Sequence, residues 1–400
     1  MRSKRAKILV AGAGIGGLTA TLGLLQRGFT VATFEQAPVL SEVGAGVQIG
    51  PNGTRALFAL GLKEALLSFS SAPGKKQIRI WNSGDRQEFV AVGTDAVSRY
   101  GAPYLMAHRA DLHNALIEAI QAIDPDCLRL GHRVSSVEQT PTVVRAIFEN
   151  DHSEEGDVLV GADGLHSAVR KSLFGPAQAK FTGGVAWRGL IPASKVTSIS
   201  SRTISTTWVG PHGHVVTYPI RQGALINFVG HVERDDWQIE GWNERGELSE
   251  CKQDFAGWHP EVQELIDGID TPFKWALFLR GTMERWSQGR ATLLGDACHA
   301  TLPYLAQGAN MAIEDGLVLA RCLDAFSSDL TAALQRYEQA RIDRTTRIVN
   351  GSAANLARFH NDAFTDSEST KKHVEQTWNK SSIAANYDWI YEYDATNVAV

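Results

Sequence analysis

The chain has 400 residues, of which 44% are hydrophobic, enough to form the cores of two or three domains. Its 39 basic and 44 acidic residues give a net charge of -5, which argues against binding to nucleic acid or to an anionic membrane surface. No run of about 18 or more apolar residues is present to cross a bilayer. The four cysteines, at positions 127, 251, 298 and 322, form neither a CxxC pair nor a zinc-ligand pattern. We therefore expect reduced thiols in a cytoplasmic protein without a metal site.

A β-α-β pattern opens the chain. Residues 7–12 (KILVAG) predict a buried strand, residues 18–27 a helix that ends at Gly28, and residues 29–35 (FTVATFE) a second strand. The pattern of strand, turn and helix returns at 156–171 and at 290–326. Parallel strands joined by helices are typical of α/β folds.

Residues 181–280 show a different pattern, in which apolar and polar residues alternate and several turn signals occur. GHVVTYPI and ALINFVGHV are separated by Arg221-Gln222-Gly223, which predicts a β-hairpin. We therefore expect a discontinuous α/β domain of residues 1–180 and 281–350 and an inserted antiparallel-sheet domain of residues 181–280. Residues 351–400 form a C-terminal segment that is helical at first and then aromatic.

The first predicted turn is rich in glycine. Gly12, Gly14 and Gly17 form G-x-G-x-x-G, with Gly16 inside it, between a strand and a helix. Such a turn brings the backbone close to a pyrophosphate at the helix N-terminus. Glu35, at the end of the next strand, can accept hydrogen bonds from a ribose diol. The turn alone does not separate FAD from NAD.

Three further segments carry a more specific signal. They are DVLVGADGLHSAVR at 157–170, GDACH at 295–299 followed by Pro303 and by QGAN at 307–310, and HRADL at 108–112. With them, most of the chain resembles the class A flavoprotein monooxygenases, the p-hydroxybenzoate hydroxylase-like family. Within that family it is most similar to salicylate hydroxylase, 3-hydroxybenzoate 6-hydroxylase and 6-hydroxynicotinate 3-monooxygenase.

The resemblance implies a Rossmann-like domain that holds FAD tightly but non-covalently, with NADH or NADPH as a transient reductant. It implies that Asp163 lies near the pyrophosphates, that Asp296 binds the ribityl chain and that Gln48 reaches the flavin or the substrate. Arg109 is either a phosphate ligand or a surface arginine. The complete expected cofactor-binding set is Gly12, Gly14, Gly16, Gly17, Glu35, Gln36, Gln48, Arg109, Val134, Asp163, Asp296, Gly308, Ala309 and Asn310.

The start of the long predicted helix at 309–325 has a physical role in this scheme. Free N–H groups and the helix dipole near Ala309 and Asn310 would stabilise negative charge on the N1–C2=O edge of reduced flavin.

Substrate chemistry requires an electron-rich ring, because the oxygen donor of this family, an FAD C4a-hydroperoxide, is an electrophile. A general base that removes the proton of a phenol is therefore useful. On the predicted strand at 213–220, His214 and Tyr218 share one face. Alternation alone favours a structural histidine and a core tyrosine, whereas the resemblance favours His214 as the base, acting directly or through Tyr218. The expected substrate-binding set is Gln48, Arg188, His214, Tyr218, Pro303 and Tyr304, in which Arg188 is either a carboxylate ligand or a structural residue.

We expect a single-component monooxygenase that hydroxylates a small phenolic acid, with salicylate as the first candidate. 3-Hydroxybenzoate and a hydroxypyridine or other heteroaromatic acid are the alternatives. An FAD-binding redox protein without oxygenase activity and a plain NAD dehydrogenase are the alternatives of another class. The aromatic residues of the C-terminal tail cap the active site, form a homodimer interface or simply pack; they are Tyr387, Trp389, Tyr391 and Tyr393.

Overall fold

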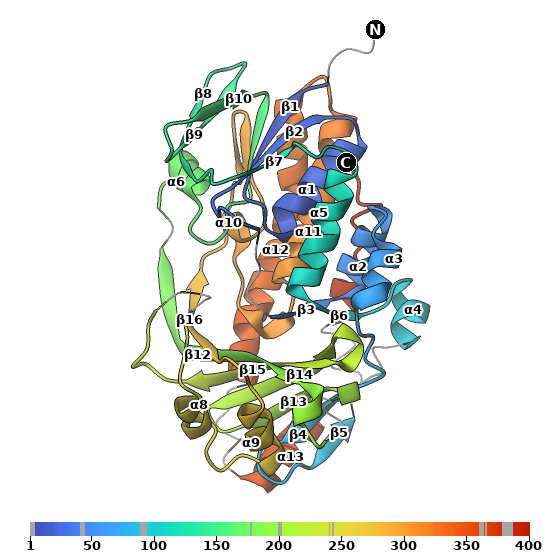
Figure 1. The fold of residues 1–400 in the computed structure, drawn as a ribbon, viewed down its shortest axis with the longest axis vertical. Coiled ribbons are helices and arrows are strands. Elements are labelled where there is room, and N and C mark those ends of the chain that lie inside the picture. The colour runs from blue at the N-terminus through green and yellow to red at the C-terminus, as the bar shows by residue number, and fades with distance from the viewer. Residues whose placement is uncertain are drawn as a thin grey trace.

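The computed structural model describes residues 5–40, 45–88, 94–176, 178–198, 202–239, 241, 244–359, 364, 366–377 and 387–400. The molecule is elongated, with one half built on a parallel sheet and the other half on a broad, mostly antiparallel sheet (Figure 1). Strand β1 (Lys7–Ala11), near the start of the described chain, and the C-terminus both lie in the parallel-sheet half (Figure 1).

The first half contains a six-stranded sheet among the described residues, in the order β17-β18-β11-β1-β2-β7. All neighbouring strands run parallel except β17 and β18. The strands are β1 (Lys7–Ala11), β2 (Thr30–Glu35), β7 (Leu128–Leu130), β11 (Val158–Gly161), β17 (Ser287–Gln288) and β18 (Ala291–Leu293). The predicted β-α-β unit is confirmed, because β1 and β2 pair in parallel.

Smaller sheets flank the parallel one. The strands β8 (Val134–Gln139), β9 (Val144–Phe148) and β10 (Ser153–Gly156) form an antiparallel sheet, and β3 (Gly46–Ile49) pairs with β6 (Leu105–His108). The helices of this half are α1 (Ile15–Gln26), α2 (Pro51–Ala59), α3 (Lys63–Phe69), α4 (Thr94–Tyr100), α5 (Arg109–Gln121), α6 (Ala168–Phe174), α10 (Asp296–His299) and α11 (Gly308–Ala325).

Helix α1 lies inside this half, with every residue from Ile15 to Leu25 buried. It packs closely on α11, where a Cβ atom on Gly316 would lie 2.7 Å from the backbone nitrogen of Ala20. A helix that is apolar on all sides needs such cover, which the α11 contact provides.

The second half contains a seven-stranded sheet among the described residues, in the order β16-β12-β15-β14-β13-β4-β5. The strands are β4 (Lys76–Ile80), β5 (Arg86–Glu88), β12 (Ala179–Pro192), β13 (Ser205–Gly210), β14 (Gly213–Ile220), β15 (Leu225–Glu233) and β16 (Phe273–Arg280). The predicted hairpin is confirmed, since β14 and β15 pair in antiparallel fashion around the short 3-10 helix η2 (Arg221–Gly223).

The sheet contains more than the predicted stretch 181–280. Strands β4 and β5 come from residues 76–88, and β4 pairs in parallel with β13. Pairing between segments so far apart in sequence depends on tertiary packing, which local alternation does not reveal. The expected domain boundaries at 180/181, 280/281 and 350/351 stay predictions. The third of them falls inside α12 (Leu330–Phe359).

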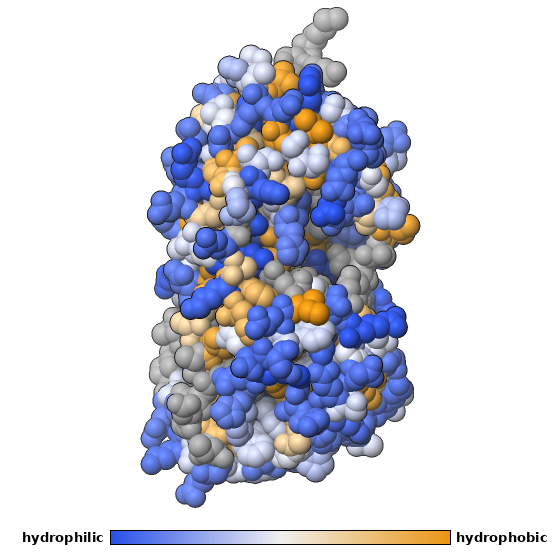
Figure 2. All heavy atoms as spheres, turned by 90° about the vertical axis from the view of Figure 1, so that its left-hand side faces the viewer, coloured by the Kyte–Doolittle hydropathy of each residue, from blue (hydrophilic) through white to orange (hydrophobic). Residues whose placement is uncertain are grey.

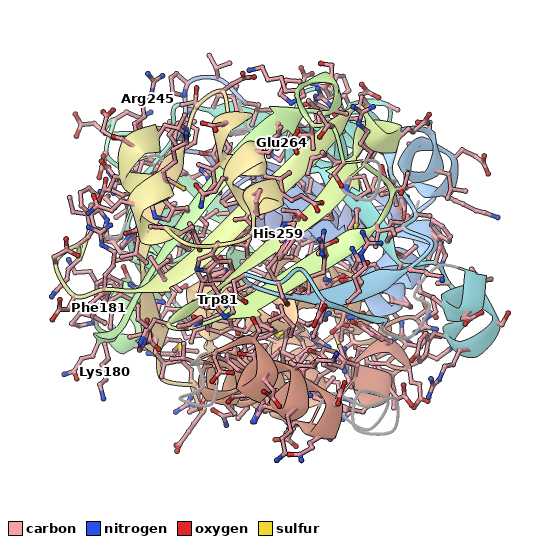
Figure 3. The ribbon with its side chains drawn as sticks, turned by 90° about the horizontal axis from the view of Figure 1, so that it is seen from below. Trp81, Lys180, Phe181, Arg245, His259 and Glu264 are labelled. Atoms are coloured by element: carbon pink, nitrogen blue, oxygen red, sulfur yellow. The ribbon has the colours of Figure 1, made fainter. Side chains whose placement is uncertain are left out.

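The two faces of the seven-stranded sheet have different neighbours. On the underside, α8 (Leu248–Asp254) and α9 (Pro260–Asp267) pack on the sheet over an apolar cluster that includes Trp187 and Phe255 (Figure 3). Near the start of α9, the backbone N–H of His259 donates to the carbonyl oxygen of Trp81 over 2.7 Å. The other face looks toward the first half. Short turns η1 (Ala193–Lys195) and η3 (Pro303–Leu305) and helix α13 (Ser367–Thr377) complete the described elements.

The C-terminal residues 387–400 lie on the first half and are held by arginines. Arg344 donates to the carbonyl oxygens of Trp389 and Ile390, and Arg55 donates to those of Tyr391 and Tyr393. The aromatic tail therefore packs within the chain itself. The expected homodimer stays a prediction.

The surface is mostly hydrophilic, with apolar residues in small groups on the face that Figure 2 shows. Within the described residues, no helix combines the length and the apolar character needed to span a membrane.

Candidate functional site

The glycine turn between β1 and α1 is shaped for close approach. Gly12 has a φ of +105°, and a Cβ atom there would lie 2.3 Å from the carbonyl oxygen of Ala162. A Cβ atom on Gly17 would lie 2.0 Å from the carbonyl oxygen of Gly12, whereas one on Gly14 would meet nothing within 4 Å. The turn is thus locked on its inner side and open at Gly14, where a phosphate can approach.

Glu35 holds this turn in place. Its Oε2 accepts a hydrogen bond from the backbone N–H of Ala13 over 2.9 Å, and its Oε1 accepts one from the N–H of Ala37, also over 2.9 Å. Each carboxylate oxygen keeps a lone pair for a further donor, as a ribose diol would supply. On the other side, the carbonyl oxygen of Ala13 is bound by His113 over 2.7 Å.

The segment after β11 is anchored through Asp163. This carboxylate accepts hydrogen bonds from the Ser167 hydroxyl and from the N–H groups of Ala168 and Val169 at the start of α6. Asp163 therefore fixes the loop that follows β11, and the backbone of its neighbours Ala162 and Gly164 reaches the cavity described below. Burial raises the pKa of Asp163.

The loop that leads into α11 is anchored through Asn310. Its Oδ1 accepts from the N–H of Gly50 over 2.9 Å, and its Nδ2 donates to the carbonyl oxygens of Gln48 and Ala306. Ala306 has a φ of +51°, a left-handed conformation that is uncommon without glycine. Gln307 is 1% exposed, and its Nε2 lacks a hydrogen-bond partner in the described part of the chain.

A cavity of about 880 Å³ lies between the two halves of the molecule. It begins at the glycine turn, passes the start of α11 and ends at the inner face of the seven-stranded sheet. The structure thus brings most of the expected site residues to one space. Those in its walls are Gly14, Gly16, Gly17, Gln48, Arg109, Arg188, His214, Tyr218, Asp296, Pro303, Tyr304, Gly308 and Ala309.

The other expected residues lie outside the walls of the cavity: Gly12, Glu35, Gln36, Val134, Asp163 and Asn310. Glu35, Asp163 and Asn310 act on the walls through the contacts above. Gln36 is exposed just after β2. Val134 is 6% exposed in β8, where it pairs with Phe148. No described contact links Val134 to the cavity, so its place in the cofactor-binding set stays a prediction.

Residues that pair across neighbouring strands form rows that run perpendicular to the strands, and several of these rows face the cavity. In one row His214 lies opposite His231, and the two imidazole rings stack with their centroids 4.4 Å apart. Phe359 stacks on His214 from α12 at 4.5 Å, and the ring of Tyr304 lies 5.6 Å away. His214 is 2% exposed and is therefore a shielded imidazole in an aromatic surround.

Tyr218 lies four residues further along β14, in another row. It pairs with Asn227, whose Oδ1 accepts from the N–H of Gly46 over 2.7 Å. A Cβ atom on Gly46 would lie 2.7 Å from the hydroxyl oxygen of Tyr218, so the loop and the tyrosine are in close contact. Burial raises the pKa of Tyr218, which therefore stays a neutral phenol near neutrality. His214 and Tyr218 thus occupy different parts of one cavity.

Lys76 is a cavity residue that the sequence did not single out. It starts β4 and lies opposite Ser205, in the row of Tyr218. Its Nζ lies 3.4 Å from Oε1 of Gln48 and 3.8 Å from the ring centroid of Tyr104. Burial lowers the pKa of Lys76 to about 7. The signal available in sequence was the alternation in KQIRI at 76–80, which puts Lys76 and Ile78 on one face.

His231 and Asn227 were also missed, although the hairpin contained the signal. A two-stranded pairing around residues 221–224 places His231 opposite His214 and Asn227 opposite Tyr218. Opposite residues in an antiparallel pair have neighbouring side chains.

The residues around this cavity fit FAD. The open side of Gly14 at the N-terminus of α1 suits the pyrophosphate, and the exposed carboxylate of Asp296 suits the ribityl hydroxyls. The first N–H groups of α11 and the Nε2 of Gln307 are donors for the carbonyl edge of the ring system. Across the described ranges, no group of three or more histidine, cysteine or acidic side chains is placed to hold a metal ion.

Comparison with known proteins agrees with this fit. The model of the FAD binding domain family matches residues 5–352. The chain is 38% identical over 396 residues to the 3-amino-4-hydroxybenzoate 2-monooxygenase PtmB3 of Streptomyces platensis, covering 99% of this chain and 98% of that one. It is 38% identical over 353 residues to the 6-hydroxynicotinate 3-monooxygenase of Pseudomonas fluorescens, covering 86% and 90%. The structure of a salicylate hydroxylase substrate complex superposes with a TM-score of 0.81 at 25% identity, covering 98% of this chain and 97% of that one.

Proposed function

Because this chain belongs to the FAD binding domain family and is an FAD-dependent aromatic monooxygenase, we propose that it hydroxylates a small hydroxyaryl carboxylic acid with O2 and NADH or NADPH. The finer parts of this proposal are the identity of the acid and the roles of individual residues.

The observation that carries the proposal is the continuity of the cavity. One space of about 880 Å³ joins the glycine turn and the start of α11 to an aromatic surface that contains two histidines and a buried tyrosine. A volume of this size accommodates part of a flavin together with one aromatic ring. An FAD-binding redox protein without a substrate would not need the polar rows of the sheet that face this space.

The cofactor end of the cavity would hold FAD through Gly14, Asp296 and the N-terminus of α11. When bound and reduced, FAD supplies the activated oxygen that is transferred to the ring. The α11 N–H groups carry partial positive charge and stabilise an anion beside them. Asn310 keeps these groups aligned with β3 and the residue after it through hydrogen bonds to Gln48 and Gly50.

At the substrate end, His214 would accept the proton of the ring hydroxyl. An imidazole titrates close to neutral pH, so it can take a phenolic proton and release it later. Stacking against His231 and Phe359 fixes the plane of the His214 ring and excludes water from its faces. Tyr218 stays protonated and can donate a hydrogen bond to the substrate.

Two kinds of acid are candidates. Salicylate is the first from the sequence, and its hydroxylation would release the carboxylate as CO2 and form catechol. The second kind has the hydroxyl opposite the carboxylate. The names of both relatives favour it, since 3-amino-4-hydroxybenzoate and 6-hydroxynicotinate share that arrangement.

The test is turnover against a panel of acids. Purified yellow protein is mixed with NADH or NADPH and with salicylate, 3-hydroxybenzoate, 6-hydroxynicotinate or 3-amino-4-hydroxybenzoate. Oxidation of the nicotinamide, the hydroxylated product and hydrogen peroxide are each quantified. The proposal predicts that one acid gives product in near-equal amount to the nicotinamide consumed. Peroxide without product for every acid would contradict it.

A further inference from the structure

Lys76 is a cation that has no acidic partner among the described residues. Within the part of the chain that the structure describes, no carboxylate forms an ion pair with it. Its neighbours supply only partial negative charge, from the amide oxygen of Gln48 and from the ring face of Tyr104. Lys76 is half-buried, and withdrawing its ammonium group from water is costly unless an anion binds it.

The neighbours of Lys76 hold it toward the cavity. The hydroxyl of Tyr104 donates to Oε1 of Gln48 over 2.7 Å, so the amide oxygen is fixed between Tyr104 and the lysine. Tyr104 is 1% exposed and its ring meets Tyr391 edge-on at 5.8 Å. Lys76, Gln48, Tyr104 and Tyr391 all line the cavity. The ammonium group therefore lies on a rigid aromatic and amide support at the substrate end.

We propose that Lys76, supported by Gln48 and Tyr104, binds the carboxylate of the aromatic substrate and sets the preference for an acid over its neutral analogue. This inference rests on the proposed function. It differs from the expectation that Arg188 pairs with the carboxylate.

The position of Arg188 supports the distinction. Arg188 lies on β12, four strand spacings from β4 in the sheet order, which is roughly 19 Å at the usual spacing. A single small acid cannot place its carboxylate against both cations. The guanidinium of Arg188 instead lies over the rings of Phe273 and Trp275, at 5.3 and 5.5 Å.

The distance between Lys76 and His214 indicates where the hydroxyl of the substrate acid lies relative to its carboxylate. Lys76 and His214 are separated by two strand spacings and four residues along the strands, roughly 17 Å between backbones. With the two side chains reaching into the space between them, an acid whose hydroxyl lies opposite its carboxylate spans the gap. In salicylate the two groups are adjacent, so it can contact one end at a time.

The experiment measures binding without turnover. Oxidised, FAD-loaded protein is titrated with 3-amino-4-hydroxybenzoate and with its carboxamide, and the Kd is obtained from the change in flavin absorbance. Lys76→Met should raise the Kd of the acid by about tenfold or more and leave that of the carboxamide within about threefold. Lys76→Arg should recover most of the affinity for the acid, because it restores the charge.

Lys75→Met is the matched control, since it removes the same charge from an exposed neighbour outside the cavity. It should leave both Kd values unchanged. Equal losses for acid and carboxamide in Lys76→Met, or an acid-selective loss in Arg188→Met instead, would overturn the proposal. So would a wild-type protein that binds acid and carboxamide equally.

Failure of the proposed function gives a different result. If acids bind through Lys76 but none is hydroxylated, the carboxylate site stands and the reaction assigned to the cavity is wrong. If hydroxylation is coupled but Lys76→Met retains the wild-type Kd and KM for the acid, only the role of Lys76 is wrong.

Discussion

His214 has surroundings that suit a proton acceptor. It is almost fully shielded, and the rings of His231 and Phe359 stack on it. These ring contacts hold the imidazole in one orientation, as a positioned proton acceptor requires. The other stacked imidazole, His231, has a nearly equivalent position.

Replacing His214 with asparagine tests the role. We expect the variant to keep its FAD and to bind the acid, while product formation falls roughly 10²- to 10⁴-fold, the usual contribution of a general base. Product measured per nicotinamide oxidised reports the loss. The variant His231→Asn distinguishes the roles of the two stacked histidines. A larger loss of product formation in His231→Asn than in His214→Asn would assign the base to His231 instead.

Lys76 should make acid binding dependent on pH. Burial lowers its pKa to about 7, so the ammonium form is present below that pH and is lost as the pH rises through it. The Kd of the acid should therefore be lowest between about pH 5 and 7, where carboxylates are ionised, and should rise by up to about tenfold per pH unit above 7.

The neighbouring groups do not mimic this profile. Burial raises the pKa values of the tyrosines around Lys76, which stay neutral in this range: Tyr104, Tyr218, Tyr387 and Tyr391. On β4 itself Arg79 pairs with Glu261 of α9, and in the turn before β5 Asp85 pairs with Lys371 of α13. His214 and His231 also line the cavity, and an ordinary imidazole changes charge at about pH 6.5, so the control is Lys76→Met. A rise in Kd above pH 7 that persists in this variant would assign the dependence to the histidines.

At the scale of elements, the contact between α1 and α11 sets the position of the cofactor end. Both helices begin at the cavity, and their axes come close because glycine occupies the contact at Gly316. The distance between the two helix N-termini therefore depends on the absence of a side chain at Gly316.

Gly316→Ala should lower the free energy of unfolding by about 1–3 kcal/mol, because its Cβ would lie 2.7 Å from the Ala20 nitrogen and the helices must separate. Chemical denaturation followed by flavin fluorescence measures it. Gly351→Ala is the control, since a Cβ there meets only Leu305 at 3.5 Å and alanine favours the helix. Equal stability of the two variants would show that the helix contact tolerates a wider spacing.

The same scale shows what the sequence reveals. The glycine turn and the hairpin at 221–223 are local, so their residues predict both structure and partners. The row that contains Lys76 is not local, because β4 meets β13 across more than a hundred residues of intervening chain. Nothing in KQIRI identifies that partner. The role of Asp163 as an anchor for α6 was also hidden, since a carboxylate after a strand can face either a ligand or the next helix.

At the scale of the whole molecule, buried charge ties the C-terminal tail to α11 and α12. Glu314 on α11 is bound by Arg341 and Arg344 on α12, and Arg344 in turn binds tail carbonyls. Burial alone would raise the pKa of Glu314, but Arg344 and Arg341 lower it below its usual value. The carboxylate therefore stays ionised, and the arginines stay oriented toward the tail.

Deletion of residues 387–400 should lower the melting temperature and reduce coupling. It removes Tyr387 and Tyr391 from the cavity wall and takes away the tail carbonyls that Arg55 and Arg344 bind. Water would enter, and more hydrogen peroxide would appear per nicotinamide oxidised. Deletion of residues 399–400 alone is the control and should change little. A long deletion that keeps both stability and coupling would mean that the tail is dispensable.

The membership of β4 and β5 in the seven-stranded sheet has a consequence for engineering. The sheet surface that faces the cavity is encoded in two pieces, one in residues 76–88 and one in residues 179–280. Transplanting the central piece from a relative would import one side of the pocket and leave the opposite side native. A designer who wants a new ring accepted must exchange the early strand pair together with the central block.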